Sequence, residues 1–242
     1  MLSKNQIKQI TRLKQKKYRI QDQLFVVEGL KTIEELLHSN MKLQSVYTTE
    51  PFNLDAKKEI LISESDLKRI SFLKTPNKAL AVFEIPESKP VVMNQLIVAL
   101  DDVRDPGNLG TIIRLCDWFG ISDLVCSLET ADCYNPKVVQ ATMGSIARVN
   151  ISYLDLADFI GNQDTTVFGA FMDGENLYQA TLPDRGILLM GNEANGISDK
   201  IQALVTHKIA IPRFGNLQET ESLNVAMATG ILLSEFKRRT IL

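Results

Sequence analysis

Histidine and cysteine are scarce in this chain, and their scarcity restricts its chemistry. The 242 residues include only two histidines, His38 and His207, so a histidine-based catalytic triad or a multi-histidine metal site is not expected. The three cysteines, Cys116, Cys126 and Cys133, form no C-x-x-C pair and are odd in number, which favours reduced thiols. These absences exclude most hydrolase mechanisms and predict no metal site.

Long hydrophobic runs are also missing. Apolar residues make up 45% of the chain, enough for a substantial core, but no run approaches the length that spans a bilayer. Met1 leads into a basic, polar segment and not into the apolar block of a secretion signal. We therefore expect a cytoplasmic protein without a membrane partner.

The charges are nearly balanced overall but unevenly distributed. Residues 1–20 contain seven cationic side chains and no acidic one. Residues 1–90 hold 16 basic and 11 acidic residues, a net charge of +5, whereas the remainder holds 11 and 18, a net charge of −7. This distribution favours a polyanionic partner at the N-terminal end. A solvated basic helix without any partner is the alternative, and charge alone does not decide between them.

The hydrophobic spacing predicts two domains. Residues 1–19 have apolar side chains at helical spacing, which predicts one basic helix, and short strand and helix patterns follow up to residue 85. The proline-containing stretch 86–90 is the best linker candidate. We therefore predict a small α/β domain over 1–90 and a second domain over 91–242.

The second domain alternates strand-like and helical patterns. Its apolar runs, such as LIVAL and ILLM, suit strands that are buried on both faces, so we predict an α/β fold with a mostly parallel sheet and helices on both faces. The expected strands lie at 95–101, 123–127, 147–153, 166–171, 187–191 and 207–211. The expected helices lie near 109–119, 135–145, 154–161, 198–205 and 222–239.

Three loops of this domain carry polar side chains directly after a predicted strand. They are 101–110, 190–198 and 211–224. Ligands of open α/β sheets bind beyond the carboxyl ends of the strands, so three such loops on one sheet predict a single composite site. The first loop lacks the G-x-G-x-x-G spacing of a dinucleotide-binding turn.

The first loop precedes a helix that places Arg114 in its second turn. Apolar neighbours on both sides predict that Arg114 sits near a core and needs a partner. A structural ion pair with Asp102 or Asp117 is the alternative to a catalytic role.

The other two loops combine glycine with polar side chains. Gly191 and Gly196 permit close backbone approach to a ligand, and Glu193 between them either contacts that ligand or has a capping or solvated role. Ser222 is a candidate N-cap of the last helix. Asn224 then falls in the first helical turn, where capping does not explain it.

Taken together, the three loops support a resemblance. The segments LDDVRDPGNLGTIIRLCDWFG, LLMGNEANGIS and IPRFGNLQETESLNVAMATGILLSEFKRR resemble, in order and spacing, the three motifs of the SpoU (TrmH-like) family of RNA ribose 2′-O-methyltransferases, within the SPOUT superfamily. The resemblance covers residues from about 95 to the end. FVVEGLKTIEELL is similar to the small L30e-like RNA-binding domain that precedes the catalytic domain in many members.

The resemblance implies a fold, a cofactor and a set of functional residues. The C-terminal domain would contain a trefoil knot and form a homodimer with the active site at the interface, S-adenosylmethionine would be the methyl donor, and the substrate would be RNA, with rRNA favoured over tRNA. Backbone at Gly191, Ile211 and Leu223 would hold the cofactor. The polar residues that match the family's functional ones are Asn108, Arg114, Glu193, Ser222 and Asn224.

The sequence departs from the family pattern in two places. Arg213 stands where methionine is usual, and the stretch from 215 to 222 is a few residues longer. The family assigns action on the ribose hydroxyl to the residue that matches Arg114. Because a guanidinium is effectively always protonated, we expect Arg114 to lower the pKa of that hydroxyl and to clamp the adjoining phosphate, while Glu193 shapes its loop or holds Arg114.

Three other functions compete with this interpretation. A non-catalytic RNA-binding or ribosome-assembly factor would not need to keep Arg114, Glu193 and Asn224 together. A methyltransferase acting on a base is disfavoured by the Ser-Leu-Asn-Val motif that begins at Ser222. A nicotinamide-dependent oxidoreductase lacks its glycine fingerprint here.

Overall fold

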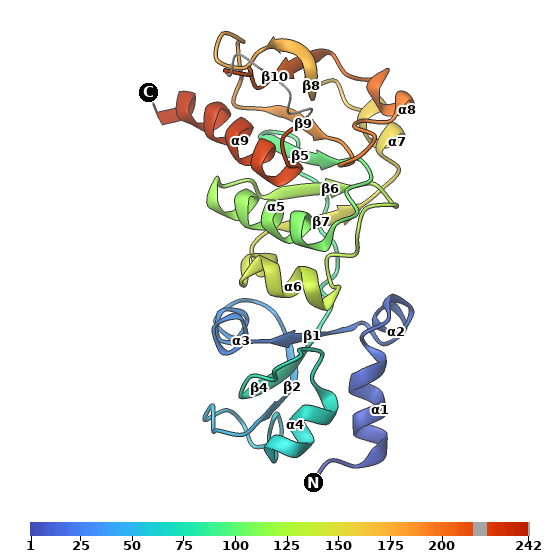
Figure 1. Ribbon diagram of the computed structural model, residues 1–242, viewed down its shortest axis with the longest axis vertical. Coiled ribbons are helices and arrows are strands. Elements are labelled where there is room, and N and C mark those ends of the chain that lie inside the picture. The colour runs from blue at the N-terminus through green and yellow to red at the C-terminus, as the bar shows by residue number, and fades with distance from the viewer. Residues whose placement is uncertain (215–221, 242) are drawn as a thin grey trace. The chain divides into compact units, whose positions relative to one another are not determined.

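The computed structural model describes residues 1–214 and 222–241 and divides the chain into two compact units (Figure 1). The first unit comprises Met1–Glu87 and Asp132–Arg148, and the second comprises Ser88–Ala131 and Val149–Leu242. The segment from Asp132 to Arg148 therefore packs with the N-terminal unit, although it follows the predicted linker in sequence. The functional division expected from the sequence, with RNA binding by 1–90 and methyl transfer by 91–242, stays a prediction.

The first unit is built on a four-stranded sheet with the order β1-β4-β2-β3. β4 pairs antiparallel with both β1 and β2, and β3 is parallel to β2. One apolar cluster of this unit joins the N-terminal helix to the sheet and to α4. The elements are α1 (Lys4–Arg12), α2 (Lys16–Asp22), β1 (Leu24–Glu28), α3 (Leu30–Leu37), β2 (Leu43–Thr48), β3 (Glu59–Leu61), α4 (Glu64–Ile70), β4 (Ala79–Glu84), α6 (Pro136–Thr142) and the 3₁₀ helix η1 (Ser145–Ala147).

The N-terminal segment forms two helices, so the prediction of one helix over 1–19 was wrong. α1 ends at Arg12 and α2 begins at Lys16. Arg19, only 2% exposed, donates from Nη1 to the carbonyl oxygens of Leu13 (2.8 Å) and Lys14 (2.9 Å). A buried guanidinium needs several acceptors, and these two carbonyls are left outside the helical ladder to supply them.

Arg19 also connects the N-terminal helices to the segment 132–148. Its Nε lies 3.1 Å from Asp132 Oδ2, and its Nη2 contacts the same oxygen. Further along the segment, the ring of Tyr134 packs on Phe25 at a centroid distance of 4.8 Å, and α6 packs against β1. The first unit therefore depends on residues that are distant from it in sequence.

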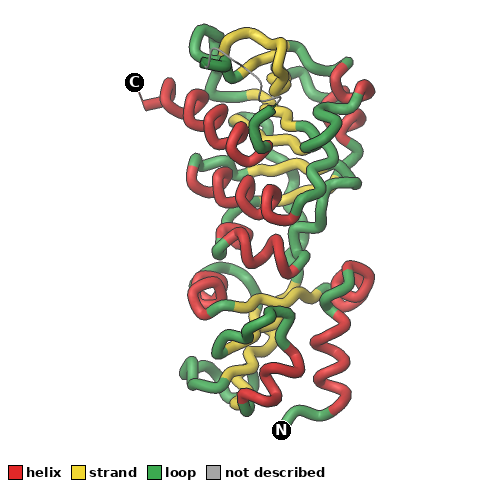
Figure 2. The backbone as a smooth tube through the Cα atoms, viewed as in Figure 1, coloured by secondary structure: helices red, strands yellow, loops and turns green. Residues whose placement is uncertain are grey.

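The second unit contains a six-stranded sheet with the order β10-β8-β9-β5-β6-β7, parallel throughout. Helices α5 and α9 cover one face, and α7 and α8 cover the other (Figures 1 and 2). The elements are β5 (Leu96–Leu100), α5 (Pro106–Trp118), β6 (Asp123–Cys126), β7 (Asn150–Tyr153), α7 (Leu156–Gly161), β8 (Val167–Asn176), β9 (Gly186–Met190), α8 (Asp199–Gln202), β10 (His207–Ala210) and α9 (Val225–Ile241).

Burial of the central strands explains this arrangement. Every residue of β5 and β9 is buried, as expected for strands that are covered on both faces, and the predicted parallel α/β fold is confirmed.

None of the described helices is long and apolar enough to cross a membrane. The knot expected from the family resemblance stays a prediction.

The pairing of β8 with β10 contains a large register shift. Lys208 pairs with Gly169, but the next residue, Ile209, pairs with Glu175. Residues 170–174 therefore leave the ladder as an extended bulge, which bends a strand and redirects its side chains. The bulge lies beside the site described next.

Candidate active site

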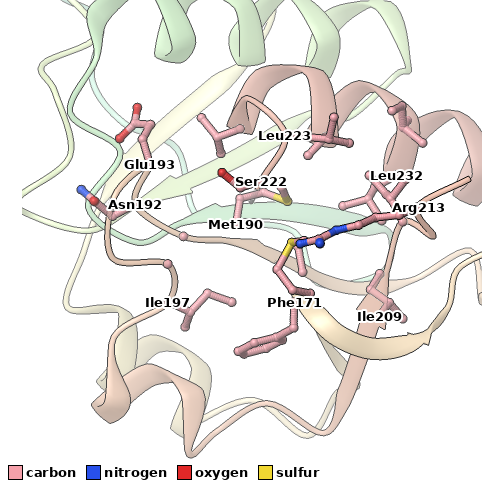
Figure 3. A pocket seen from close by; sticks show the side chains of 18 of the residues that line it. Phe171, Met190, Asn192, Glu193, Ile197, Ile209, Arg213, Ser222, Leu223 and Leu232 are labelled. Carbon is pink, nitrogen blue, oxygen red and sulfur yellow. The ribbon is translucent and has the colours of Figure 1, made fainter. Parts of the chain in front are cut away.

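Three loops meet at the carboxyl edge of the parallel sheet, as predicted. They follow β5 (residues 101–105), β9 (191–198) and β10 (211–214 and, before α9, 222–224). The first two are joined by hydrogen bonds: Asn192 Nδ2 donates to the carbonyl oxygen of Asp102 at 2.7 Å, and Ser198 N donates to Asp101 Oδ2 at 2.7 Å. A cavity of about 1310 Å³ opens between the second loop, the third loop and the β8 bulge (Figure 3).

Glu193 holds the first loop in place. Its carboxylate accepts hydrogen bonds from the backbone N–H groups of Arg104 (3.4 Å) and Asp105 (3.3 Å) and from Asn108 Nδ2 (3.0 Å). Three donors orient this carboxylate toward the start of α5. Of the roles expected for Glu193, the structure shows that of shaping the loop, and none of its described hydrogen bonds goes to Arg114.

Asn108 connects the first loop to the third. It lies in the first turn of α5, where Asp105 caps the helix by accepting from Asn108 N at 2.8 Å. Its side-chain Nδ2 donates to Glu193, and its Oδ1 accepts from Asn224 Nδ2 at 2.8 Å. One polar chain, Glu193–Asn108–Asn224, therefore crosses all three loops.

Asn224, and not Ser222, caps α9. The helix begins at Val225, and Asn224 Oδ1 accepts from the N–H groups of Ala226 (3.0 Å) and Met227 (3.2 Å). The sequence interpretation placed the helix start at Ser222, three residues too early. Asparagine is as good an N-cap as serine, so the capping signal was present but was assigned to the wrong residue.

The three residues expected to hold a cofactor all line the cavity. Gly191, Ile211 and Leu223 contribute to its wall, and Ser222 lies beside Leu223 (Figure 3). A Cβ at Gly191 would lie 2.3 Å from the backbone of Gly196 and Ile197, so only glycine fits there. A close approach of backbone to Gly191 was expected, and here the backbone that approaches belongs to the same loop.

Arg114 stands apart from the other predicted residues. It is exposed on α5, does not line the cavity, and makes no hydrogen bond or ion pair with the residues that the structure describes. The expectation that it sits near a core was therefore wrong. Asp102, which was considered as an ion-pair partner of Arg114, pairs with Arg104 at 2.7 Å instead. This hydrogen bond raises the pKa of Arg104.

Some residues of the site were missed in the sequence. Asn192 ties two loops together, and its position after Gly191 in a glycine-flanked turn was the available signal. Phe171, within the β8 bulge, and Tyr178, just after the end of β8, also line the cavity. Nothing in the local pattern marked them, because their approach depends on the register shift between β8 and β10.

The fold and the site together define a class. A parallel α/β sheet with a cavity and convergent polar groups beyond its strand ends is typical of proteins that bind a nucleotide-like ligand at that edge. A sequence profile described as the SpoU rRNA methylase family matches residues 95–234, and another, the MRM3-like substrate binding domain, matches residues 4–81. The chain therefore belongs to the SpoU rRNA methylase family, as the three motifs predicted.

Individual relatives resemble the chain over its full length. The 23S rRNA (guanosine(2553)-2′-O)-methyltransferase RlmP of Bacillus subtilis is 28% identical over 96% of both sequences. The structure of a putative RNA methyltransferase of the TrmH family from Porphyromonas gingivalis is 41% identical, with a TM-score of 0.89 over 99% of both chains. An S-adenosylmethionine-bound rRNA methyltransferase from Sinorhizobium meliloti is 31% identical, with a TM-score of 0.88 over 100% of this chain and 97% of that one.

Proposed function

We propose that this protein transfers a methyl group from S-adenosylmethionine to the ribose 2′-hydroxyl of a nucleotide in rRNA. The observation that carries the proposal is the hydrogen-bonded chain Glu193–Asn108–Asn224, which joins the three family motifs beside the cavity. Relatives that match over nearly the whole length are named as rRNA methyltransferases. tRNA is the second candidate substrate, because enzymes named for tRNA are also among the relatives.

The cavity fits S-adenosylmethionine in size and lining. Its volume of about 1310 Å³ exceeds the usual range of about 300–1,000 Å³ for small-molecule sites, which leaves room for a nucleotide as well. Ile197, Ile209 and Leu232 give it apolar walls suited to an adenine ring, and backbone at Gly191 and Ile211 offers hydrogen-bonding groups. The bound cofactor would supply an electrophilic methyl group.

The residues around the cavity would position the ribose and its hydroxyl. A 2′-hydroxyl is a weak nucleophile until its proton is removed or polarised, and correct positioning supplies much of the acceleration. Ser222 and the Asn108–Asn224 pair present hydroxyl and amide groups at this point. Arg114 would lower the pKa of the hydroxyl and clamp the adjoining phosphate, because a guanidinium does not release its own proton.

We propose that Arg114 acts in the cavity of a second copy of the chain. The proposal is supported by its exposure and by its absence from the lining of its own cavity. Trp118, one turn further along α5, is 84% exposed, and Met227 on the adjoining α9 is 64% exposed. Exposed apolar side chains on two packed helices suit an isologous dimer interface that includes Arg114.

The family's trefoil knot is also part of the proposal. β9 lies between β8 and β5 in the sheet, β10 lies beyond β8, and the chain then returns so that α9 packs on α5. A knotted path requires, in addition, that one segment of the chain pass through a loop formed by another. A cytoplasmic location is proposed as well, since the three buried cysteines carry no disulfide.

The basic first unit would contact the RNA. Its first two helices and the turn between them expose lysines at positions 4, 8, 14, 16 and 17, and Lys17 lies 4.7 Å from the ring centroid of Tyr18. Lysines bind phosphate groups with little regard for sequence. The first unit is therefore expected to contribute affinity and the second unit to contribute the chemistry.

The Arg114→Ala variant tests the catalytic assignment. Loss of a preorganised cation should lower kcat by about 100-fold or more, while the Kd for S-adenosylmethionine stays within about twofold. Methyl incorporation into rRNA and isothermal titration measure the two quantities. Alkaline digestion of rRNA that the wild-type protein has methylated should leave an alkali-resistant dinucleotide, as ribose methylation requires.

Arg185→Ala is the matched control. Arg185 is also exposed in the second unit, but it precedes β9 and so lies at the opposite edge of the sheet. Normal turnover by Arg114→Ala would contradict the role of Arg114. A wild-type protein that neither binds the cofactor nor methylates rRNA would contradict the function as a whole.

A further inference from the structure

The opening of the cavity carries an exposed pair of aromatic side chains. The inner walls are shielded from solvent, since Ile209 and Leu232 are each 1% exposed (Figure 3). Tyr178 and Phe214 line the same cavity but are 46% and 81% exposed. A side chain that lines a cavity and also faces solvent lies where the cavity opens. The two rings therefore form part of the mouth of the cavity.

The two rings contact each other and still leave ring area to solvent. Their centroids lie 6.3 Å apart and their planes are tilted by 40°, so they do not stack face to face. Hydrogen bonds hold the backbone at Tyr178: its N–H donates to Asn176 Oδ1 at 3.0 Å, and the N–H of Leu177, which is fully buried, donates to the carbonyl oxygen of Ala210 at 2.9 Å. The pair is a preformed aromatic surface.

The rings belong to a larger group of exposed apolar side chains. Met172, 55% exposed, and Leu223, 50% exposed, line the same cavity. Exposed apolar side chains that are grouped mark a binding site, whereas scattered single ones do not. Unstacked bases of single-stranded RNA stack on phenylalanine and tyrosine rings, and every base has a π face that can do so.

We propose that Tyr178 and Phe214 stack with a nucleobase of the RNA strand that enters this cavity. The inference rests on the proposed function, which brings an RNA ribose to the cavity. The cofactor would occupy the shielded interior, and the base would lie on the rings at the mouth. A second copy of the chain is a less suitable occupant, because the dimer face proposed above lies on α5 and α9, to which neither ring belongs.

Phe214→Ala tests the proposal, because it removes the more exposed ring. Loss of one stacked base should raise the KM for rRNA by about 5- to 150-fold in a methyl-incorporation assay. The Kd for S-adenosylmethionine, measured by isothermal titration, should stay within about twofold, because the ring does not reach the shielded interior. Phe214→Trp keeps a π face and should keep the KM within about threefold, whereas Phe214→Leu should lose affinity for rRNA as Phe214→Ala does.

Val92→Ala is the matched control for loss of an exposed apolar side chain. Val92 is 48% exposed in the second unit and precedes β5, so it lies at the opposite edge of the sheet from the cavity. It should change neither the KM for rRNA nor the Kd for S-adenosylmethionine. Thermal unfolding of each variant checks that the fold is intact.

Four results would overturn the proposal. Two are a wild-type KM for rRNA in Phe214→Ala and a wild-type KM in Phe214→Leu, the second of which would show that apolar area and not stacking matters. A rise in the Kd for S-adenosylmethionine as large as the rise in KM would place the ring on the cofactor. Dissociation of Phe214→Ala into monomers in sedimentation would place it against a second copy. The proposed function is tested separately, because it depends on the wild-type protein binding the cofactor and methylating rRNA.

Discussion

At the scale of single residues, Asn224 makes hydrogen bonds in two directions, one set through each end of its side-chain amide. Its Oδ1 caps α9, and its Nδ2 donates to Asn108 at 2.8 Å. Because the cap fixes which end of the amide faces the helix, the donor is aimed at Asn108 without further restraint. A structural requirement of the helix thereby orients a polar group of the site.

The Asn224→Asp variant separates these two roles. Aspartate caps a helix as well as asparagine does, so the free energy of unfolding should change by less than about 0.5 kcal/mol. The donor to Asn108 is lost, however, and a carboxylate would face the Asn108 oxygen. Turnover should fall by about 10- to 100-fold, as measured by methyl incorporation.

Asn224→Ala provides the comparison, because it removes the cap as well and should cost about 1 kcal/mol of stability in addition to activity. An Asn224→Asp enzyme with wild-type turnover would show that the contact with Asn108 does not matter for the reaction.

The residues of the site were predictable to different extents. The meeting of Asn108, Glu193 and Asn224 follows from their places after parallel strands, which all end at the same edge. The separation of Arg114 from them follows from helix geometry. Each residue of an α-helix turns the side-chain direction by about 100°. Asn108 and Arg114 are six residues apart, so their side-chain directions differ by roughly 240° around the axis of α5, and they point to different faces of the helix.

At the scale of elements, the helices and strands were predicted better than their ends and contacts. Strands buried on both faces leave a clear apolar run, as in β5 and β9. The break between α1 and α2 was missed because its cause is a long-range one: Arg19 takes two backbone carbonyls and also reaches Asp132, which is 113 residues away in sequence. The β8 bulge was missed for a similar reason.

The Arg19→Met variant measures what this contact contributes. Removing one partner leaves the Asp132 carboxylate without its cation and Leu13 and Lys14 without their donor, so the free energy of unfolding should fall by about 3–5 kcal/mol. Urea denaturation followed by circular dichroism measures the change.

Lys78→Met is the control for loss of a cation, because the Lys78–Glu50 pair is more than half exposed on both sides. It should change stability by less than about 1 kcal/mol. Equal stability of Arg19→Met and the wild type would show that the break between α1 and α2 does not depend on Arg19.

At the scale of the whole molecule, the placement of Arg114 outside its own cavity and the proposed homodimer together predict complementation between two impaired variants. In a mixture of Arg114→Ala and Asn224→Asp chains, half of the dimers are mixed, and each mixed dimer has one site with both residues intact. The refolded or co-expressed mixture should therefore recover about a quarter of wild-type turnover, whereas each variant alone stays at or below about a tenth of it. No recovery would mean that Arg114 acts within its own chain.

The membership of residues 132–148 in the first unit has a consequence for synthesis on the ribosome. Residues 1–87 emerge first, but the partner of Arg19 and the helix that packs on β1 emerge only after β5, α5 and β6. Domains usually fold in the order in which they leave the ribosome. Here the N-terminal unit stays incomplete until residue 148 has been made, so the two units are expected to mature together.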